Sequence, residues 1–191
     1  MKKRALGPQG LLYPTPVLLV GTYGPDGKAN IMTAAWGGIC CSRPPCIYVS
    51  LRPATLTHGS IVAGGCYTVS IPPEGLIREA DYAGLASGRD VDKFQELGLT
   101  AVRGTRVNAP FVEECPVVLE CRLVQKVELG SHTQFVGEVV EALADEDVLD
   151  ANGLPDEHLT RPTVSIPATR HYYGLGECLG DCFSIGRRAE S

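Results

Sequence analysis

Two segments offer the hydrogen-bond donors and positive charge that a phosphate-bearing ligand requires. The first is Arg52-Pro53-Ala54-Thr55-Leu56-Thr57-His58, which joins a predicted strand to a predicted helix and combines hydroxyls with free backbone N–H groups. Taken alone, it favours a simple helix cap by Thr57. The second is Ser87-Gly88-Arg89-Asp90-Val91-Asp92-Lys93-Phe94. Lys93 lies just inside a predicted helix start, where the helix dipole opposes a cation, so it indicates either a nearby anion or a solvated side chain.

The segment with the most chemical character is Asn30-Ile31-Met32-Thr33-Ala34-Ala35-Trp36. Asn30 and Thr33 are polar within an otherwise apolar predicted strand, and the single tryptophan of the chain follows at once. A flat aromatic side chain beside exposed backbone amides could flank the isoalloxazine ring of a flavin. The same pattern is equally typical of a tryptophan in the core.

The cysteines do not form a recognisable metal site. The chain has eight cysteines but no Cys-x-x-Cys unit, so the sequence predicts no metal ligands; they are Cys40, Cys41, Cys46, Cys66, Cys115, Cys121, Cys178 and Cys182. Cys178 and Cys182 are four residues apart and could meet on a helix as a functional thiol pair. In a reduced compartment, however, a cysteine is more commonly a buried free thiol than part of a functional pair. We interpret Cys40 and Cys41 in the same way.

Composition narrows the classes of function. The chain has 191 residues, 44% hydrophobic and 20% charged, with a net charge of -5, as expected for a folded globular protein. Because the longest basic run is Lys2-Lys3-Arg4, nucleic acid is not an expected partner. No apolar stretch approaches the roughly 20 residues of a membrane span. Tyr13-Pro14-Thr15-Pro16 interrupts what would be the apolar region of a signal peptide, so we expect a cytoplasmic protein.

The elements that must position these residues are mainly strands. Twenty-two glycines and fourteen prolines indicate many turns. Residues 16–23 and 28–36 flank Gly24-Pro25-Asp26-Gly27 and predict a β-hairpin. Further strands are predicted at 46–51 and 66–71, with a helix between them that begins near Thr57 and ends at Gly64-Gly65.

The second half of the chain continues this pattern. Helices are predicted at 76–86 and 92–97, and residues 119–129 alternate between apolar and polar side chains, as in a half-buried strand. After a turn at 130–132, residues 133–143 form its predicted partner, and 162–167 could hold one more strand. The order predicts a single domain, residues 1–191, with a mainly β fold: a small antiparallel barrel with a few peripheral helices. No G-x-G-x-x-G follows the first strand, which argues against a Rossmann site.

Five motifs in this order resemble the flavin reductase-like family, and within it the flavoredoxin branch. They are Y-P-T-P-V at 13–17, N-I-M-T-A-A-W at 30–36, Y-V-S-L-R-P-A-T-L-T at 48–57, S-G-R-D-V-D-K-F at 87–94 and R-H-Y-Y-G-L-G at 170–176. The resemblance covers nearly the whole chain. It implies an FMN-binding antiparallel split β-barrel of the Greek-key type, with non-covalent FMN as cofactor. It also implies a homodimer in which each flavin lies near the subunit interface.

The resemblance also implies the site residues. Asn30, Thr33 and Trp36 would follow the ribityl chain and the ring, with backbone amides at Ala34 and Ala35. Ser50, Arg52, Thr55 and Thr57 would face the phosphate, with Leu51 beside them, and Lys93 would contact an anionic group of the flavin. His132 would approach the cofactor from either subunit, and Tyr172 or Tyr173 would cover the ring. No catalytic acid or base is assigned, since electron or hydride transfer through a flavin requires none.

One departure from the family pattern bears on function. Many relatives carry a serine where this chain has Ala34-Ala35, so backbone amides must replace that hydroxyl. We therefore expect a flavoredoxin-type electron carrier that exchanges electrons with a redox protein partner, and the alternative is an NAD(P)H-dependent flavin reductase. Two further hypotheses remain open: a barrel that binds a ligand without turnover, and thiol-based redox chemistry at Cys178 and Cys182.

Overall fold

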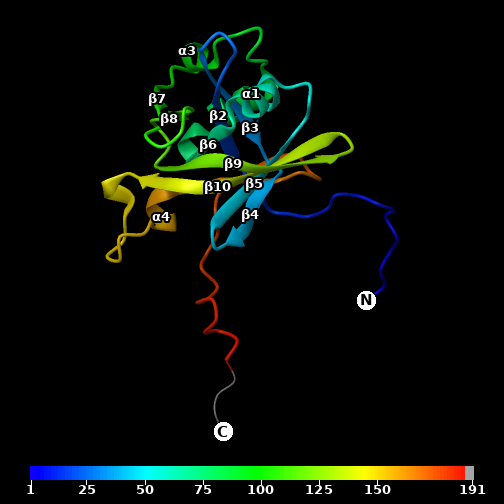
Figure 1. The fold of residues 1–191 in the computed structure, drawn as a ribbon. Coiled ribbons are helices and arrows are strands. Elements are labelled where there is room, and N and C mark those ends of the chain that lie inside the picture. The colour runs from blue at the N-terminus through cyan, green and yellow to red at the C-terminus, as the bar shows by residue number, and fades with distance from the viewer. Residues whose placement is uncertain (188–191) are drawn as a thin grey trace.

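The computed structural model describes residues 1–187, and a seven-stranded antiparallel sheet is its centre (Figure 1). The strand order is β3-β2-β6-β9-β10-β5-β4. The strands are β2 (Leu18–Tyr23), β3 (Ala29–Ala34), β4 (Gly37–Ser42), β5 (Pro45–Leu51), β6 (Cys66–Ile71), β9 (Val117–Leu129) and β10 (His132–Ala144). The sheet is open, because β3 and β4 are its two edges. These edge strands are consecutive in the chain, and only Ala35 and Trp36 join them.

Smaller elements surround this sheet. A three-stranded sheet combines β1 (Thr15–Pro16), β11 (Val164–Ile166) and β12 (His171–Tyr173), and a hairpin combines β7 (Ala101–Arg103) with β8 (Pro110–Val112). The helices are α1 (Leu56–Gly64), α2 (Ile77–Leu85), α3 (Lys93–Leu97) and α4 (Glu157–Thr160), with 3-10 turns η1 (Glu74–Leu76) and η2 (Glu146–Val148). The N-terminal segment before β1 and the segment that follows β12, up to residue 187, extend away from the body of the molecule (Figure 1).

Strand β2 is buried on both faces, which explains why its sequence is apolar without alternation. Leu18 and Val20 pack into one hydrophobic cluster with side chains of β5, β6 and β10. Leu19 packs into a second cluster with residues of α2, α3 and β8. Gly21 lies where β8 crosses: a Cβ there would be 1.9 Å from the carbonyl oxygen of Pro110, so a larger residue would push the two strands apart.

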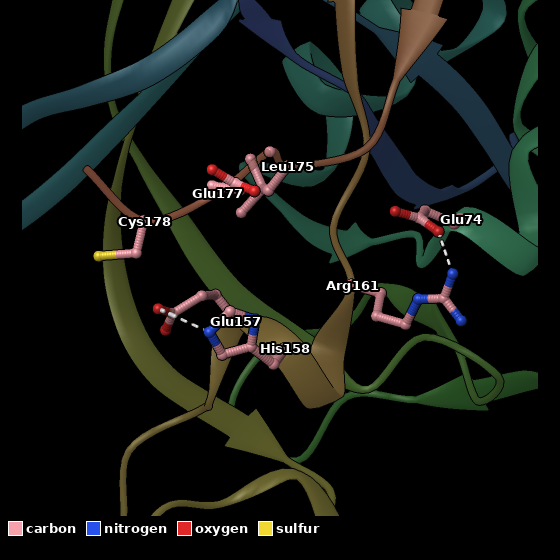
Figure 2. A pocket seen from close by; sticks show the side chains of 8 residues that line it. Glu74, Glu157, His158, Arg161, Leu175, Glu177 and Cys178 are labelled. Atoms are coloured by element: carbon pink, nitrogen blue, oxygen red, sulfur yellow. Dashed lines mark hydrogen bonds and ion pairs between the residues drawn. The ribbon is translucent and has the colours of Figure 1, made fainter.

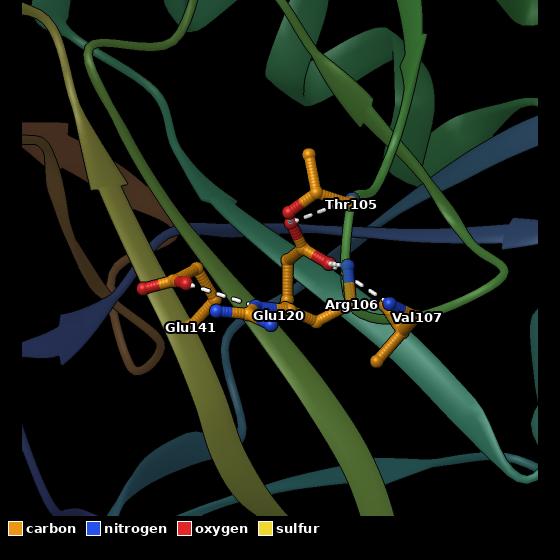
Figure 3. A network of polar contacts seen from close by, with 5 residues as sticks. All are labelled: Thr105, Arg106, Val107, Glu120 and Glu141. Carbon is orange, nitrogen blue, oxygen red and sulfur yellow. Dashed lines mark hydrogen bonds and ion pairs between the residues drawn. The ribbon is translucent and has the colours of Figure 1, made fainter.

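A buried carboxylate fixes the loop between β7 and β8 (Figure 3). Glu120 on β9 is fully buried, and its two oxygens accept hydrogen bonds from the backbone N–H groups of Thr105 (2.9 Å), Arg106 (2.7 Å) and Val107 (2.9 Å). The Thr105 hydroxyl adds a fourth donor at 3.0 Å. Burial acts to raise the pKa of Glu120, but these donors outweigh it and hold the pKa below its ordinary value.

Most elements predicted from sequence are confirmed. The fold is mainly β and antiparallel; the hairpin of β2 and β3, the strands β5 and β6, the long pair β9 and β10, and the helices α2 and α3 occur where the patterns place them. The predicted cap of α1 is wrong: Thr55 is the cap, its hydroxyl accepting from the N–H of His58, and Thr57 is buried inside the helix. Residues 178–182 are not helical, so Cys178 and Cys182 do not meet on a helix.

Candidate functional site

A hollow that we call the seam cavity lies between edge strand β3 and the end of β5. It has a volume of about 410 Å³ and lies where β3 ends and β5 ends; its lining residues are Met32, Thr33, Ala34, Ala35, Trp36, Ser50, Leu51, Arg52, Thr55, Gly84 and His132. A volume of this size falls within the roughly 300–1,000 Å³ typical of small-molecule sites. Nine of the residues predicted for the cofactor site are therefore brought together around one space.

Edge strand β3 gives this cavity a wall of backbone polar groups. β3 pairs only with β2. The backbone N–H and C=O groups of every second residue of β3 therefore point away from β2 and are left for a different partner. The Thr33 hydroxyl donates to the carbonyl oxygen of Ala80 on α2, which fixes the helix against this edge. The N–H of Ser50 donates to the carbonyl oxygen of Trp36 at 2.8 Å, holding the Trp36 backbone against β5. The Trp36 side chain is 43% exposed and presents a flat apolar surface.

Positive charge lies at one end of the cavity. Among the described residues that line it, Arg52 carries the one permanent charge, and no lining residue is acidic. The neighbouring Thr55 hydroxyl donates to the carbonyl oxygen of Arg52 at 3.0 Å, which fixes the turn before α1. His132 lies at the start of β10, and its Nδ1 is 2.8 Å from the hydroxyl oxygen of Ser131. These groups are suited to an anionic ligand.

Three predicted site residues are buried and do not line the seam cavity. The Asn30 side-chain amide donates to the hydroxyl of Thr57 at 2.9 Å, and both residues are buried. The Lys93 ammonium donates to the carbonyl oxygens of Ile31 (2.9 Å) and Ala83 (2.6 Å), which precede the lining residues Met32 and Gly84. Burial lowers the pKa of Lys93 to about 8. Contact between Lys93 and a flavin anion stays a prediction.

A second hollow adjoins the seam cavity and shares Thr33, Ala35 and Trp36 with it. Tyr172 lines this second hollow, of about 310 Å³, and donates a hydrogen bond to Asp81 at 2.7 Å. Burial, followed by the hydrogen bond to the Asp81 carboxylate, raises the pKa of Tyr172 to about 12. Tyr173 is more exposed and pairs with Val164 on β11. Of the two tyrosines predicted to cover a ring, Tyr172 therefore has the better position.

A larger hollow near the C-terminal segment has the wrong charge for a phosphate (Figure 2). It measures about 490 Å³, and its lining residues are Glu74, Glu157, His158, Arg161, Leu175, Gly176, Glu177 and Cys178. Arg161 forms an ion pair with Glu74, and His158 lies 3.9 Å from Glu157. The remaining carboxylates leave this wall acidic, so an anionic cofactor is favoured in the seam cavity instead.

Comparison with known proteins identifies the family of the chain. The model of the flavin reductase like domain matches residues 10–170. The chain belongs to the flavin reductase-like family. The fold of flavoredoxin from Desulfovibrio vulgaris (Miyazaki F) matches with a TM-score of 0.93 and 49% identity over 97% of this chain and 100% of that chain.

More distant members of the same fold extend this picture. Flavoredoxin from Methanosarcina acetivorans has a TM-score of 0.92 and 30% identity over 98% of both chains. An FMN-binding protein from Thermus thermophilus has a TM-score of 0.79 and 26% identity over 95% of this chain and 99% of that chain. The family and these neighbours support a flavin-related redox protein with a flavin cofactor. Within residues 1–187, no helix is both long and apolar enough to cross a membrane, and no group of three His, Cys, Asp or Glu side chains is arranged to hold a metal ion.

Sequence reasoning missed several residues around these hollows. Gly84 lies in the last turn of α2, and a Cβ there would be 3.2 Å from the Cβ of Thr33, so the glycine lets the helix approach the edge strand closely. An isolated glycine in a helical pattern is a signal for such an approach. Asp81 orients Tyr172 from one turn earlier in α2. No local pattern identifies Asp81, because its partner is 91 residues away.

Proposed function

We propose that the protein binds one FMN non-covalently in the seam cavity and carries electrons through it in the manner of a flavoredoxin. The observation that supports this most is the position of the cavity at the edge of β3, between an exposed flat tryptophan and a single arginine. In this proposal, residues 1–191 act as one FMN-binding unit, and the open sheet serves as a split barrel of the Greek-key type.

The residues of the cavity fit the chemistry of FMN. Its pyrimidine edge has alternating donor and acceptor groups, which match the free edge of β3 near Ala34 and Ala35. Trp36 offers an apolar face for the ring. Arg52 offers charge for the phosphate and the hydroxyl of Ser50 offers a hydrogen bond, whereas Thr55 fixes the turn that positions Arg52.

When bound, FMN supplies the one- or two-electron chemistry that no side chain of the protein can supply. The protein binds and orients the ring through the β3 edge. The imidazole of His132 lies beside the same space and adds a hydrogen-bond donor for negative charge on the ring. Arg52 keeps the phosphate end fixed, and the Lys93 ammonium places positive charge behind the wall through Ile31 and Ala83.

We further propose that the protein is a homodimer whose second copy covers the open side of the cavity. Large apolar side chains are exposed on both extended terminal segments; they are Leu6, Leu11, Leu12 and Tyr13 near the N-terminus, and Leu175, Leu179, Phe183 and Ile185 near the C-terminus. Exposed apolar groups on such a scale are typical of surfaces that bind another protein. A second copy of the chain is the partner we infer, and sedimentation of the flavin-loaded protein tests it.

The visible spectrum tests the cofactor. We expect purified protein to be yellow and the chromophore released by denaturation to have the mass of FMN. Colourless protein that takes up no added FMN would favour a barrel that binds a ligand without turnover.

Two histidine substitutions test the place of binding. His132→Ala removes a seam-cavity side chain, whereas His158→Ala removes a histidine of the acidic hollow near the C-terminus. We expect His132→Ala to weaken FMN binding by roughly tenfold, about 1.4 kcal/mol, and His158→Ala to leave it unchanged. Equal losses in both variants would contradict binding at the seam cavity.

The second candidate function is an NAD(P)H-dependent flavin reductase, and the family match leaves it open. Anaerobic addition of NADH or NADPH distinguishes the two. In an electron carrier, the flavin absorbance bleaches slowly with NADH or NADPH and quickly with a ferredoxin-type donor. In a reductase, the flavin absorbance bleaches quickly with NADH or NADPH alone. A cytoplasmic location and the absence of a nucleic-acid partner stay predictions in this proposal.

A further inference from the structure

A β-bulge near the turn of the β4–β5 hairpin brings three thiols together. Ile39 pairs with Ile47 and Cys41 pairs with Cys46, so the register shifts by one residue and Cys40 is the extra residue of β4. Two residues of a bulged strand oppose one residue of its partner, so Cys40 and Cys41 both face Cys46. The Cys40 thiol lies 3.5 Å from the carbonyl oxygen of Cys46, whereas Cys41 is in direct register with Cys46.

The pair Cys41 and Cys46 has the spacing that a disulfide requires. Directly opposed residues of antiparallel strands have Cα atoms about 4.5 or 5.5 Å apart. Both separations lie within the range of about 4.4–6.8 Å over which two cysteines can be linked. Linking the two therefore requires side-chain rotation and no change of strand register.

The Cys41 and Cys46 thiols differ in their exposure to solvent, so they have different roles in thiol exchange. Cys41 is exposed on an edge strand, and Cys46 is buried beneath it. Burial, and then the negative charge that Cys41 would carry, raise the pKa of Cys46. A reagent from solution can therefore reach Cys41 first, and Cys46 is positioned to attack the product from inside the sheet.

We propose that Cys41 and Cys46 are a redox-active thiol pair that closes reversibly into an intrachain disulfide by exchange with a small-molecule disulfide. The Cys41 thiolate attacks one sulfur of the disulfide RSSR, which releases RS⁻ and forms a mixed disulfide on Cys41. The Cys46 thiol loses its proton to solvent and attacks the Cys41 sulfur, which releases the second RS⁻. Two protein thiols are oxidised, one RSSR is reduced to two RSH, and excess RSH reverses both steps.

This pair is separate from the proposed flavin site. Cys46 is near one end of β5 and Leu51 is at the other, and at about 3.3 Å per residue the two lie roughly 16 Å apart. None of Cys40, Cys41 and Cys46 lines the seam cavity. The thiol chemistry therefore does not depend on whether the cavity binds FMN.

The test treats the full-length protein with oxidised glutathione, blocks free thiols with iodoacetamide, and analyses the chymotryptic peptide that follows Trp36 and ends at Tyr48. This peptide contains all three thiols. We expect it to lose the mass of two hydrogen atoms, to bear one alkyl group at Cys40, and to regain its other two thiols with dithiothreitol. The Cys40→Ser variant is the matched control and keeps the internal disulfide.

The Cys41→Ser variant has no internal disulfide and keeps its fold, because the substituted side chain is exposed. Three results overturn the proposal: an internal disulfide that persists in Cys41→Ser, its loss in Cys40→Ser, or a wild-type peptide linked to another chain or bearing glutathione alone. The Cys46→Ala variant repeats the test at the buried partner. Circular dichroism confirms that each variant is folded.

Discussion

Replacing the buried Glu120 with glutamine tests whether one carboxylate holds the β7–β8 loop. The native carboxylate accepts four hydrogen bonds, two at each oxygen. A glutamine side chain has one oxygen and one NH₂ group, so Glu120→Gln places a donor where the loop offers donors (Figure 3). If the NH₂ group faces Arg106 and Val107, both of their N–H groups lose their acceptor. If it faces Thr105, the N–H of Thr105 loses its acceptor, although the Thr105 hydroxyl can turn to accept from the NH₂ group.

The expected cost follows from these lost bonds. Hydrogen bonds to a charged group contribute about 1.5–3 kcal/mol each, and part of this returns when the loop admits water, so we expect Glu120→Gln to lower the free energy of unfolding by about 3 kcal/mol. For a chain of this size each kcal/mol corresponds to roughly 2–4 °C, which predicts a fall in Tm of about 6–12 °C. Differential scanning calorimetry at neutral pH measures it.

The effect depends on pH with a definite sign. The pKa of Glu120 is lower in the folded protein than its ordinary value, so its contribution to stability is complete above the unfolded pKa of about 4.3. The contribution is lost as the pH falls through the folded pKa. The difference in Tm between the wild-type protein and Glu120→Gln should therefore narrow below this point.

Glu141→Gln is the matched control, because it makes the same chemical change within the same network. Glu141 accepts from Arg106 at 3.2 Å near the surface, and such pairs contribute about 0–1 kcal/mol. Equal Tm values for the two variants, or a Tm of Glu120→Gln within 2 °C of the wild type, would refute the reasoning about the buried carboxylate.

Three further predictions concern the cavity and its wall. Lys93 should titrate near pH 8 by NMR. Because a lysine in the unfolded chain keeps its proton up to about pH 10.4, the free energy of unfolding should rise with pH between these two values. Titration above pH 10 would show that the ammonium is not buried. Thr57→Val removes the acceptor of the Asn30 amide and should cost about 1–3 kcal/mol in urea denaturation, and an unchanged midpoint would contradict that bond. Arg52→Gln should weaken FMN by roughly tenfold but riboflavin little; equal losses for both ligands would show that Arg52 does not contact the phosphate.

The sequence predicts best those elements whose side chains alternate or whose ends are marked. The pair β9 and β10 follows from the polar and apolar alternation of residues 119–129, and β6 is bounded by Gly64-Gly65 and Pro72-Pro73. Strand β4 was missed because Gly37-Gly38 and Cys40-Cys41 give no period-2 pattern, and the bulge at Cys40 breaks it further.

The sequence indicates which candidate residues lie around one cavity, but it does not indicate which of them are buried. The motifs that contain Trp36 and Arg52 identify residues that the fold brings together, and His132, which the family resemblance alone indicates, lies with them. Lys93 could not be recognised as buried, since α3 has five residues and its acceptors are 10 and 62 residues away in the chain. Which hydroxyl caps a helix and which is buried, as with Thr55 and Thr57, depends on the tertiary partner Asn30.

The extended ends of the chain decide where a reporter can be attached. Affinity tags and fusion partners are by habit joined to a terminus, and here that places bulky hydrophilic chain next to Leu6, Leu12 and Phe183, whose apolar side chains are exposed. The tight turn after η2 is a better position. Its residues 151–153 are exposed and line none of the three hollows described above. A fluorophore or epitope inserted there leaves the N-terminal and C-terminal segments free to pack against a second copy of the chain.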